Sequence, residues 1–252
     1  MTVLVGISCR GGIVIGADSS ATFSSGTHQT IEQPTQKVAV LCANSVIVAG
    51  TGSVGLYQRF EQVVSNRFSK VVEPTAWNIA KDMSKHAIDD FASTHAKQSQ
   101  FGALLAFIPP KEKEPVLFEY DIATFQPELK DDKLWYVSMG SGQNIADPFL
   151  ALAREVFWQG GKPELSEGVF AALWALDLTI GINAGGVNGP AVIAVIEKLD
   201  PKAGYKARIL TEDEMAEHRQ NIAGAKSALR SYKEKQGDSS LPVKDVPKPP
   251  AA

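Results

Sequence analysis

The close spacing of short apolar runs in the first fifty residues constrains the fold more than any other feature of this sequence. Four runs rich in β-branched and other apolar residues cover 3–8, 13–17, 37–42 and 45–49. The turn sequences Arg10-Gly11-Gly12 and Ala43-Asn44 separate the members of each pair. Connections this short predict antiparallel hairpins, because parallel strands need a crossover of about a dozen residues or more. The polar stretch 19–34 predicts a loop, with room for a short strand near Thr30.

Helical spacing of apolar residues follows the hairpins. It runs from Leu56 to Val64 and, after Pro74, from Ile79 to Phe91. Further strands are expected at 101–108, 116–121, 134–139, 191–196 and 205–210, and further helices at 145–159 and 165–182. A capping box of Thr211 and Glu214 starts a last helix, which is expected to end near Lys233. This order predicts an α+β sandwich of two stacked antiparallel sheets with helices outside.

The length of 252 residues suits one large domain or two small ones. We expect a single domain over 1–235, because the later strands belong to the same sandwich as the early ones. The segment 236–252 places four prolines among charged residues, which predicts a disordered tail.

Composition excludes several classes of protein. A formal net charge of -3 gives no excess of cations for nucleic acid or an anionic membrane. Cys9 and Cys42 are the two cysteines and form no CxxC, so we expect a reducing, cytoplasmic location. No basic segment precedes a long apolar run, and Asp177 interrupts the longest apolar stretch, 171–182. We therefore expect a soluble protein.

The segment Gly50-Thr51-Gly52-Ser53-Val54-Gly55 is a complete GxGxxG between a predicted strand and a predicted helix. With Glu73 downstream, it suggests the phosphate-binding turn of a dinucleotide-dependent oxidoreductase. The preceding strand has an antiparallel partner, however, and only Val71-Val72 stands where a second parallel strand is required. Glycines that permit close backbone packing at a strand-to-helix turn account for the pattern without a ligand.

Thr2 follows the initiator methionine, and a small second residue generally permits removal of that methionine. The hydroxyl and a free α-amine would then belong to one residue. An α-amine has a pKa near ~8, so part of it is neutral at cellular pH and can accept the hydroxyl proton. Thr2 would thus be a nucleophile that carries its own base. Many chains begin Met-Thr without any such role.

Other segments join Thr2 in a recognisable pattern: residues 16–22 (GADSSAT) with Asp18, Lys37 before a strand that ends in Ala49-Gly50, and Gly140-Ser141-Gly142 before the third helix. Over residues 2–196 the chain resembles the proteasome β-subunit and HslV family of N-terminal-nucleophile (Ntn) hydrolases. The likeness is greatest to the bacterial proteasome homologue, a β-type-only member beside HslV and Anbu. The resemblance implies a four-layer αββα sandwich.

The resemblance also implies roles for individual residues. Thr2 would be the nucleophile and its amine the base, while Asp18 would orient Lys37 beside the hydroxyl. The backbone N–H of Gly50 would stabilise the oxyanion, and Ser141 would hydrogen-bond near the Thr2 amine. Without Thr2, an Asp18–Lys37 pair would be an ordinary ion pair at a strand end.

The resemblance places the apolar Ala21 and Val48 at the first substrate pocket, which predicts an uncharged side chain of modest size there, and Thr22 on the substrate backbone. The sequence departs from the family after the fourth helix. The family has an Asp-x-x-Ser-Gly-Gly segment, whereas residues 182–189 read INAGGVNG. Asn183 stands nearest to the acid, and the serine is missing, so activity could be weak, selective or lost.

These features predict a threonine peptidase that acts through an acyl-enzyme, with no cofactor or metal. The resemblance implies a homo-oligomeric double ring, with a 14-mer preferred over a 12-mer, that degrades peptides or unfolded proteins and works with an ATP-driven unfoldase. Two alternatives stay open: a ring-forming homologue with weak or no peptidase activity, and, more remotely, the dinucleotide-binding oxidoreductase.

Overall fold

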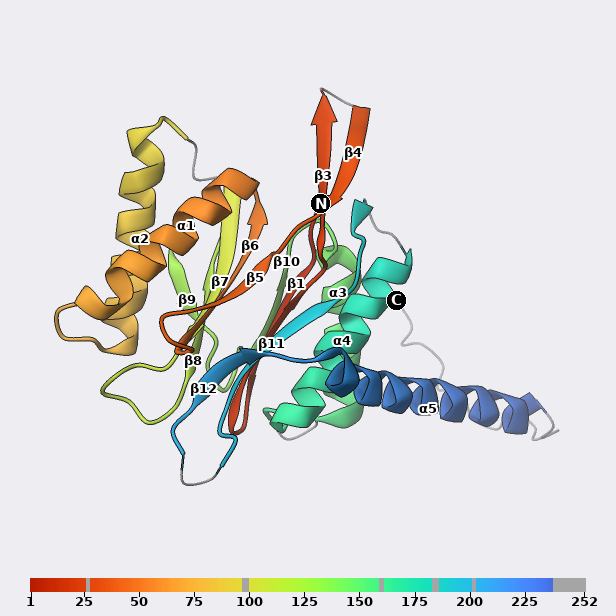
Figure 1. Ribbon diagram of the computed structural model, residues 1–252. Helices are drawn as coiled ribbons and strands as arrows, with labels where there is room; N and C mark the ends of the chain where they lie inside the picture. Colours follow the sequence, from red (N-terminus) through yellow and green to blue (C-terminus); the bar gives the residue numbers. More distant parts are fainter. Residues whose placement is uncertain (26–27, 97–99, 159–160, 183–185, 201–202, 238–252) are drawn as a thin grey trace, which may run out of the picture.

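A computed structural model describes residues 1–25, 28–96, 100–158, 161–182, 186–200 and 203–237 (Figure 1). One antiparallel sheet has the strand order β10-β1-β2-β11-β12. Its strands are β1 (Leu4–Cys9), β2 (Gly12–Ala17), β10 (Tyr136–Met139), β11 (Val192–Glu197) and β12 (Lys206–Ile209). The tight turn at positive-φ Gly11 fixes the β1–β2 register, in which Leu4 lies opposite Ala17. The predicted first hairpin is therefore confirmed.

The second sheet has the order β5-β6-β7-β8-β9 and is also antiparallel. Its strands are β5 (Val38–Leu41), β6 (Val46–Gly52), β7 (Phe101–Phe107), β8 (Val116–Tyr120) and β9 (Pro127–Leu129). The β5–β6 turn holds Cys42, Ala43 and Asn44 at positive φ, in line with the expected turn at Ala43-Asn44. The sequence did not predict β9, which is a three-residue edge strand.

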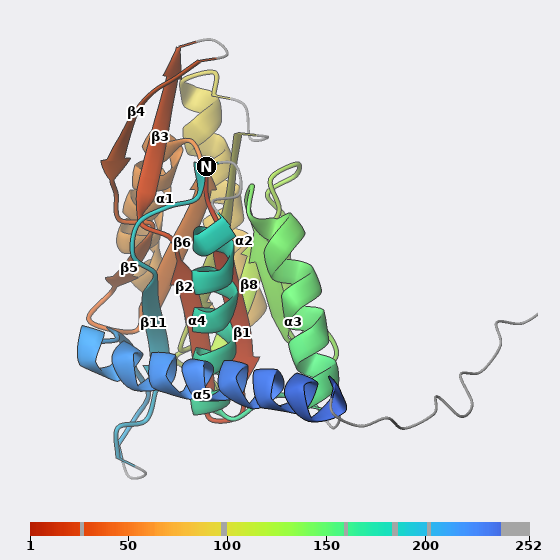
Figure 2. The same cartoon turned by 90° about the vertical axis from the view of Figure 1, so that its right-hand side faces the viewer.

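Helices cover the outer face of each sheet (Figures 1 and 2). On the second sheet lie α1 (Val54–Arg67) and α2 (Ala76–Ser93), joined by the short helix η1 (Phe68–Lys70). On the first sheet lie α3 (Gln143–Phe157) and α4 (Leu165–Ile182), with α5 (Glu212–Gly237) crossing α4. The chain thus folds as the predicted αββα sandwich.

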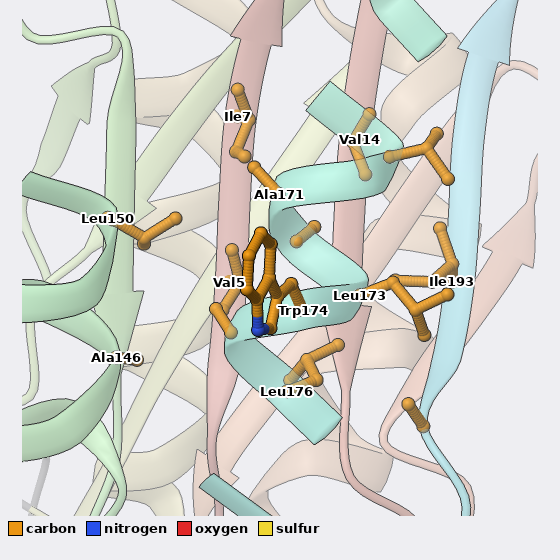
Figure 3. Packing of buried hydrophobic residues seen from close by; sticks show 14 of the residues in the cluster. Val5, Ile7, Val14, Ala146, Leu150, Ala171, Leu173, Trp174, Leu176 and Ile193 are labelled. Carbon is orange, nitrogen blue, oxygen red and sulfur yellow. The ribbon is translucent and has the colours of Figure 1, made fainter. Parts of the chain in front are cut away.

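Strand alternation divides the core into three layers. In β6, Val46 and Val48 pack under α1 and α2, while Ile47 and Ala49 face the other sheet. In β1, Val5 and Ile7 pack under α4, as Figure 3 shows for Trp174 and its neighbours. Both faces of these central strands are buried, which explains their nearly continuous apolar sequences.

Helix α4 is long and apolar enough to cross a membrane by length and composition alone. In this fold it is a core helix, because it packs against β1, β2, α3 and α5. Half of its residues are buried, and they include Ala172, Leu173 and Leu176.

Residues 19–34 form more regular structure than the expected loop, and the short strand expected near Thr30 is confirmed as β4 (His28–Pro34). Strands β3 (Ser20–Ser25) and β4 (His28–Pro34) form a separate two-stranded hairpin that projects from the sandwich (Figure 1). Phe23 and Ile31, which lie opposite each other, are 44% and 52% exposed, so this pair is not part of a buried core. A hairpin that projects from the sandwich needs no buried face, so its sequence lacks the apolar alternation by which strands are recognised.

At the other end of the chain, α5 continues to Gly237, beyond the expected end near Lys233 and two residues into the expected tail. The rest of that tail, 238–252, lies outside the described residues. The domain boundary therefore stays a prediction.

The fold argues against the dinucleotide turn. Strand β6 pairs antiparallel with both β5 and β7, so the parallel β-α-β unit of such a site is missing among the described strands. A Cβ on Gly50 would lie 2.4 Å from Cδ2 of Tyr57 and 2.7 Å from Cε2 of Phe101. Gly52 has φ +103° and leaves no room for a Cβ beside the Gln100 carbonyl. Close packing accounts for both glycines.

Candidate active site

Thr2 lies two residues before the start of β1, and the N-terminus beside it lies at the base of the β3–β4 hairpin (Figure 1). It is 6% exposed. Its N–H donates to Oγ of Ser141 at 3.1 Å, and its carbonyl accepts from the Gly142 N–H at 3.1 Å. The turn at residues 140–142 therefore holds the backbone of Thr2 on both sides, at the start of α3.

Asp18 follows β2 and meets Lys37, which precedes β5. Nζ of Lys37 lies 2.9 and 2.8 Å from the two carboxylate oxygens of Asp18. Oδ1 of Asp18 also accepts from the Val3 N–H at 2.9 Å. Burial lowers the pKa of Lys37, and the carboxylate of Asp18 opposes this effect. Asp18 thus anchors both the lysine and the residue after Thr2.

Thr2 and Lys37 converge on one atom. With Met1 still attached, Oγ1 of Thr2 donates to the Met1 carbonyl oxygen at 2.7 Å, and Nζ of Lys37 donates to the same oxygen at 2.7 Å. An acyl carbonyl oxygen beside the Thr2 hydroxyl is therefore within hydrogen-bond reach of a lysine. A cation in this position stabilises negative charge that develops on such an oxygen.

The structure places Gly50 beside this group, but its N–H already has an acceptor. It donates to the Lys37 carbonyl oxygen at 3.2 Å. An oxyanion would have to share or displace that carbonyl to use the Gly50 donor. The oxyanion role of Gly50 stays a prediction.

Two cavities adjoin Thr2, and Met1, Thr2, Thr51 and Gly52 line both of them. The smaller cavity, of about 50 Å³, is lined partly by Ala21, Thr22, Lys37, Gly50 and Tyr57. The larger cavity, of about 450 Å³, is lined by Met1, Thr2, Thr51, Gly52, Glu119, Asp121, Ile122, Met139, Gly140, Ser141 and Gln143.

Two predicted substrate residues, Ala21 and Thr22, line the smaller cavity. Val48 does not line it, because its side chain is fully buried under α1 and α2. Tyr57, from α1, is among the residues that line this cavity. Tyr57 was not predicted, because its only signal in the sequence is its place one turn into α1 after the glycine-rich segment.

One predicted site residue cannot be placed, and three residues that line the larger cavity were not predicted. Asn183 lies outside the described residues. Glu119, Asp121 and Gln143 reach the larger cavity from β8, the turn after it and α3, and sequence spacing gave no sign of them. Among the described residues, no group of three His, Cys, Asp or Glu side chains could hold a metal ion.

Comparison with known proteins decides the family. The family model described as proteasome subunit matches residues 2–165, more than half of the chain. The chain belongs to the proteasome subunit family. A search of curated proteins finds no match.

Solved structures of Anbu share the fold of this proteasome-family chain. A mutant of Anbu from Hyphomicrobium sp. strain MC1 superposes with a TM-score of 0.71 at 16% identity, covering 94% of this chain and 100% of its own. Anbu, the ancestral β-subunit, from Yersinia bercovieri gives 0.67 at 15% identity, with 97% and 100% covered. The helical assembly of the Anbu complex from Pseudomonas aeruginosa gives 0.67 at 15%, with 97% and 98% covered.

At these identities the likeness establishes the fold of the proteasome-family chain and leaves its chemistry to its own residues. The expected greater likeness to the bacterial proteasome homologue stays a prediction. The chemistry available beside Thr2 is a hydroxyl, a buried ammonium held by a carboxylate, and a serine on the nitrogen of Thr2.

Proposed function

We propose that this chain is a threonine peptidase that hydrolyses peptide bonds through an acyl-enzyme ester on Thr2. The observation that carries the proposal is the convergence of Oγ1 of Thr2 and Nζ of Lys37 on one carbonyl oxygen, each at 2.7 Å. That oxygen belongs to Met1, whose removal would free the Thr2 amine and open the same space to a substrate carbonyl.

The proposed reaction uses groups within hydrogen-bond reach of Thr2. The neutral amine takes the hydroxyl proton as Oγ1 bonds to the substrate carbonyl carbon. The Lys37 ammonium stabilises the charge on the carbonyl oxygen, and Asp18 keeps that ammonium in place. The amine then gives its proton to the leaving nitrogen as the C–N bond breaks, and water later hydrolyses the ester.

Mass spectrometry of the N-terminus tests this proposal. We expect a mass that lacks Met1 and a single adduct on Thr2 after treatment with a peptide epoxyketone. A retained Met1 would contradict the proposal, because an acylated nitrogen cannot accept the hydroxyl proton.

We also propose a homo-oligomeric double ring, a 14-mer in preference to a 12-mer, working in the cytoplasm with an ATP-driven unfoldase on peptides or unfolded proteins. Membership of the proteasome family and the assembly of the Pseudomonas aeruginosa relative support an oligomer. The free thiols of Cys9 and Cys42 are compatible with a cytoplasmic location. Native mass spectrometry would give the subunit number, and a monomer at micromolar concentration would contradict the assembly.

A ring-forming subunit with weak or no peptidase activity is the second candidate. It is favoured by the occupied N–H of Gly50 and by Asn183, which stands where the family has an acid. This alternative predicts an intact oligomer whose Thr2 stays unlabelled by the epoxyketone. Stoichiometric labelling of Thr2 would dismiss it.

A further inference from the structure

The larger cavity beside Thr2 is formed by segments that lie far apart in the sequence. Residues at the end of β6 and the end of β10 form part of its lining, and the turn before α3 adds Ser141. Glu119 on β8 and Asp121 just after it bring two carboxylates into the same cavity. The cavity is roughly large enough for a long side chain together with its backbone.

The position of the Thr2 nitrogen indicates which part of a substrate enters this cavity. In the proposed reaction, the amine that accepts the hydroxyl proton returns it to the leaving nitrogen, so the leaving group departs on the side of the amine. The Thr2 nitrogen faces Oγ of Ser141 at 3.1 Å. Ser141 lines the larger cavity and does not line the smaller one. The larger cavity therefore receives the residue that follows the scissile bond.

Glu119 contributes a carboxylate whose charge is only partly neutralised. Its Oε2 lies 2.5 Å from Nζ of Lys130, but the same Nζ lies 2.5 Å from Oε1 of Glu128. One ammonium thus serves two carboxylates. The Glu119 side chain is 19% exposed, whereas the side chain of Glu128 is 57% exposed and does not line the cavity.

Asp121 adds a second carboxylate, which its own turn keeps ionised. It accepts the N–H groups of Ala123 and Thr124 at 2.8 and 2.9 Å and the hydroxyl of Thr124. Slight burial acts to raise its pKa, but these hydrogen bonds outweigh that effect and lower the pKa below its ordinary value. Apart from the N-terminal amine, the cavity lining and its paired neighbours carry three carboxylates and one ammonium.

We propose that the larger cavity is the leaving-group subsite of this peptidase and that Glu119 and Asp121 select a lysine or arginine immediately after the scissile bond. The inference rests on the proposed peptidase function. The thioether of Met139 and the half-exposed Ile122 offer apolar surface to the alkyl stem of such a residue, while its cationic end reaches the carboxylates. No corresponding carboxylate lines the smaller cavity among the described residues.

The test uses quenched fluorescent peptides that differ only in the residue after the cleaved bond, which is Lys, Arg, Gln, Leu or Glu. We expect kcat/KM to be roughly tenfold higher for Lys than for Gln, a ratio equivalent to about 1.4 kcal/mol. In the double variant Glu119→Gln/Asp121→Asn, the ratio should fall to about twofold or less. The control Asp132→Asn removes an exposed carboxylate that pairs with Lys162 and does not line the cavity, so it should keep the full ratio.

Epoxyketone labelling of Thr2, which requires the acyl side only, separates this inference from the proposed function. Labelling together with equal cleavage of the Lys and Gln peptides would overturn the subsite and leave the peptidase standing. The same holds for a preference that survives in the double variant or disappears in Asp132→Asn. Absence of both labelling and cleavage would overturn the two proposals together.

Discussion

Lys37 and Asp18 form an ion pair that is almost completely removed from solvent, with Nζ 2.8 Å from Oδ2 and side chains 7% and 0% exposed. The pair also holds the residues on either side of Thr2, because Asp18 accepts from the Val3 N–H and Lys37 donates to the Met1 carbonyl. A buried pair of this kind contributes little net stability when both partners are present. Removing one partner leaves an uncompensated buried charge.

Asp18→Asn should therefore lower the free energy of unfolding by about 3–5 kcal/mol and abolish turnover, because Lys37 loses its counter-charge. Urea titration followed by circular dichroism measures the first effect. Asp82→Asn is the matched control: Asp82 pairs with Arg67 at 3.1 Å, but the two side chains are 21% and 33% exposed, so its loss should cost about 1 kcal/mol or less. Equal destabilisation by the two substitutions would contradict this account of the buried pair.

Thr2→Ser should retain peptidase activity, whereas Thr2→Ala should lower kcat/KM by about 10³-fold or more, because only serine keeps a hydroxyl on the N-terminal residue. Serine lacks the methyl group that restrains χ1. We expect a loss of about three- to tenfold, as a misplaced rotamer costs on the order of 1 kcal/mol. Peptide hydrolysis by both variants, each with its N-terminal mass verified, gives the comparison. Equal activity of Thr2→Ala and the wild type would exclude Thr2 as nucleophile.

Sequence spacing was sufficient for most of the fold because the decisive contacts are local. The turns at Gly11 and at Ala43-Asn44 each join strands that pair directly, so short connections determine the sheet type. Of hairpin β3–β4, only a short strand near Thr30 was expected, because both strands are polar and project from the sandwich. Strand β9 has three residues, too few to show a period.

The site was predictable only in part. Thr2, Asp18, Lys37 and Ser141 lie in segments that resemble a family pattern, and the structure brings them together. Glu119 and Asp121 approach Thr2 from more than a hundred residues away, so no spacing rule points to them. Val48 was misjudged because alternation along β6 turns its side chain toward the helices.

The pH dependence of kcat/KM should be bell-shaped. The rate rises with pH through the pKa of the amine, because only the neutral amine accepts a proton, and falls through the pKa of Lys37, because only the ammonium stabilises the oxyanion. Burial and the charge of Lys37 lower the pKa of the Met1 amine below 8.0, and we expect the same on the Thr2 amine after processing. Burial likewise lowers the pKa of Lys37 below 10.5.

Both midpoints should consequently lie below these ordinary values. A profile of kcat/KM from pH 5 to 11, at constant ionic strength, measures them. In Lys37→Arg, any residual activity should lose the alkaline limb, because a guanidinium keeps its charge throughout this range. An unchanged alkaline limb in that variant would assign the limb to another group.

The glycine-rich segment should respond to alanine in opposite ways at two of its positions. At Gly50, a Cβ would lie 2.4 Å from the ring of Tyr57 and 2.7 Å from that of Phe101, so Gly50→Ala should destabilise the protein by about 1–3 kcal/mol and impair the adjoining site. At Gly55, inside α1, a Cβ would meet only Oγ of Ser53 at 4.0 Å. Gly55→Ala should raise stability by about 0.4–1 kcal/mol, because alanine fits this backbone without strain and loses less conformational freedom on folding.

Thermal unfolding of the two variants tests this contrast, and calorimetric titration with NAD tests the ligand alternative on the wild type. Packing predicts opposite shifts in Tm and no heat of NAD binding. A dinucleotide turn predicts saturable NAD binding that Gly55→Ala weakens, since its third glycine allows close approach of the helix to the strand. Because Gly55 has open space around it while Gly50 is confined by two rings, the structure favours the packing outcome.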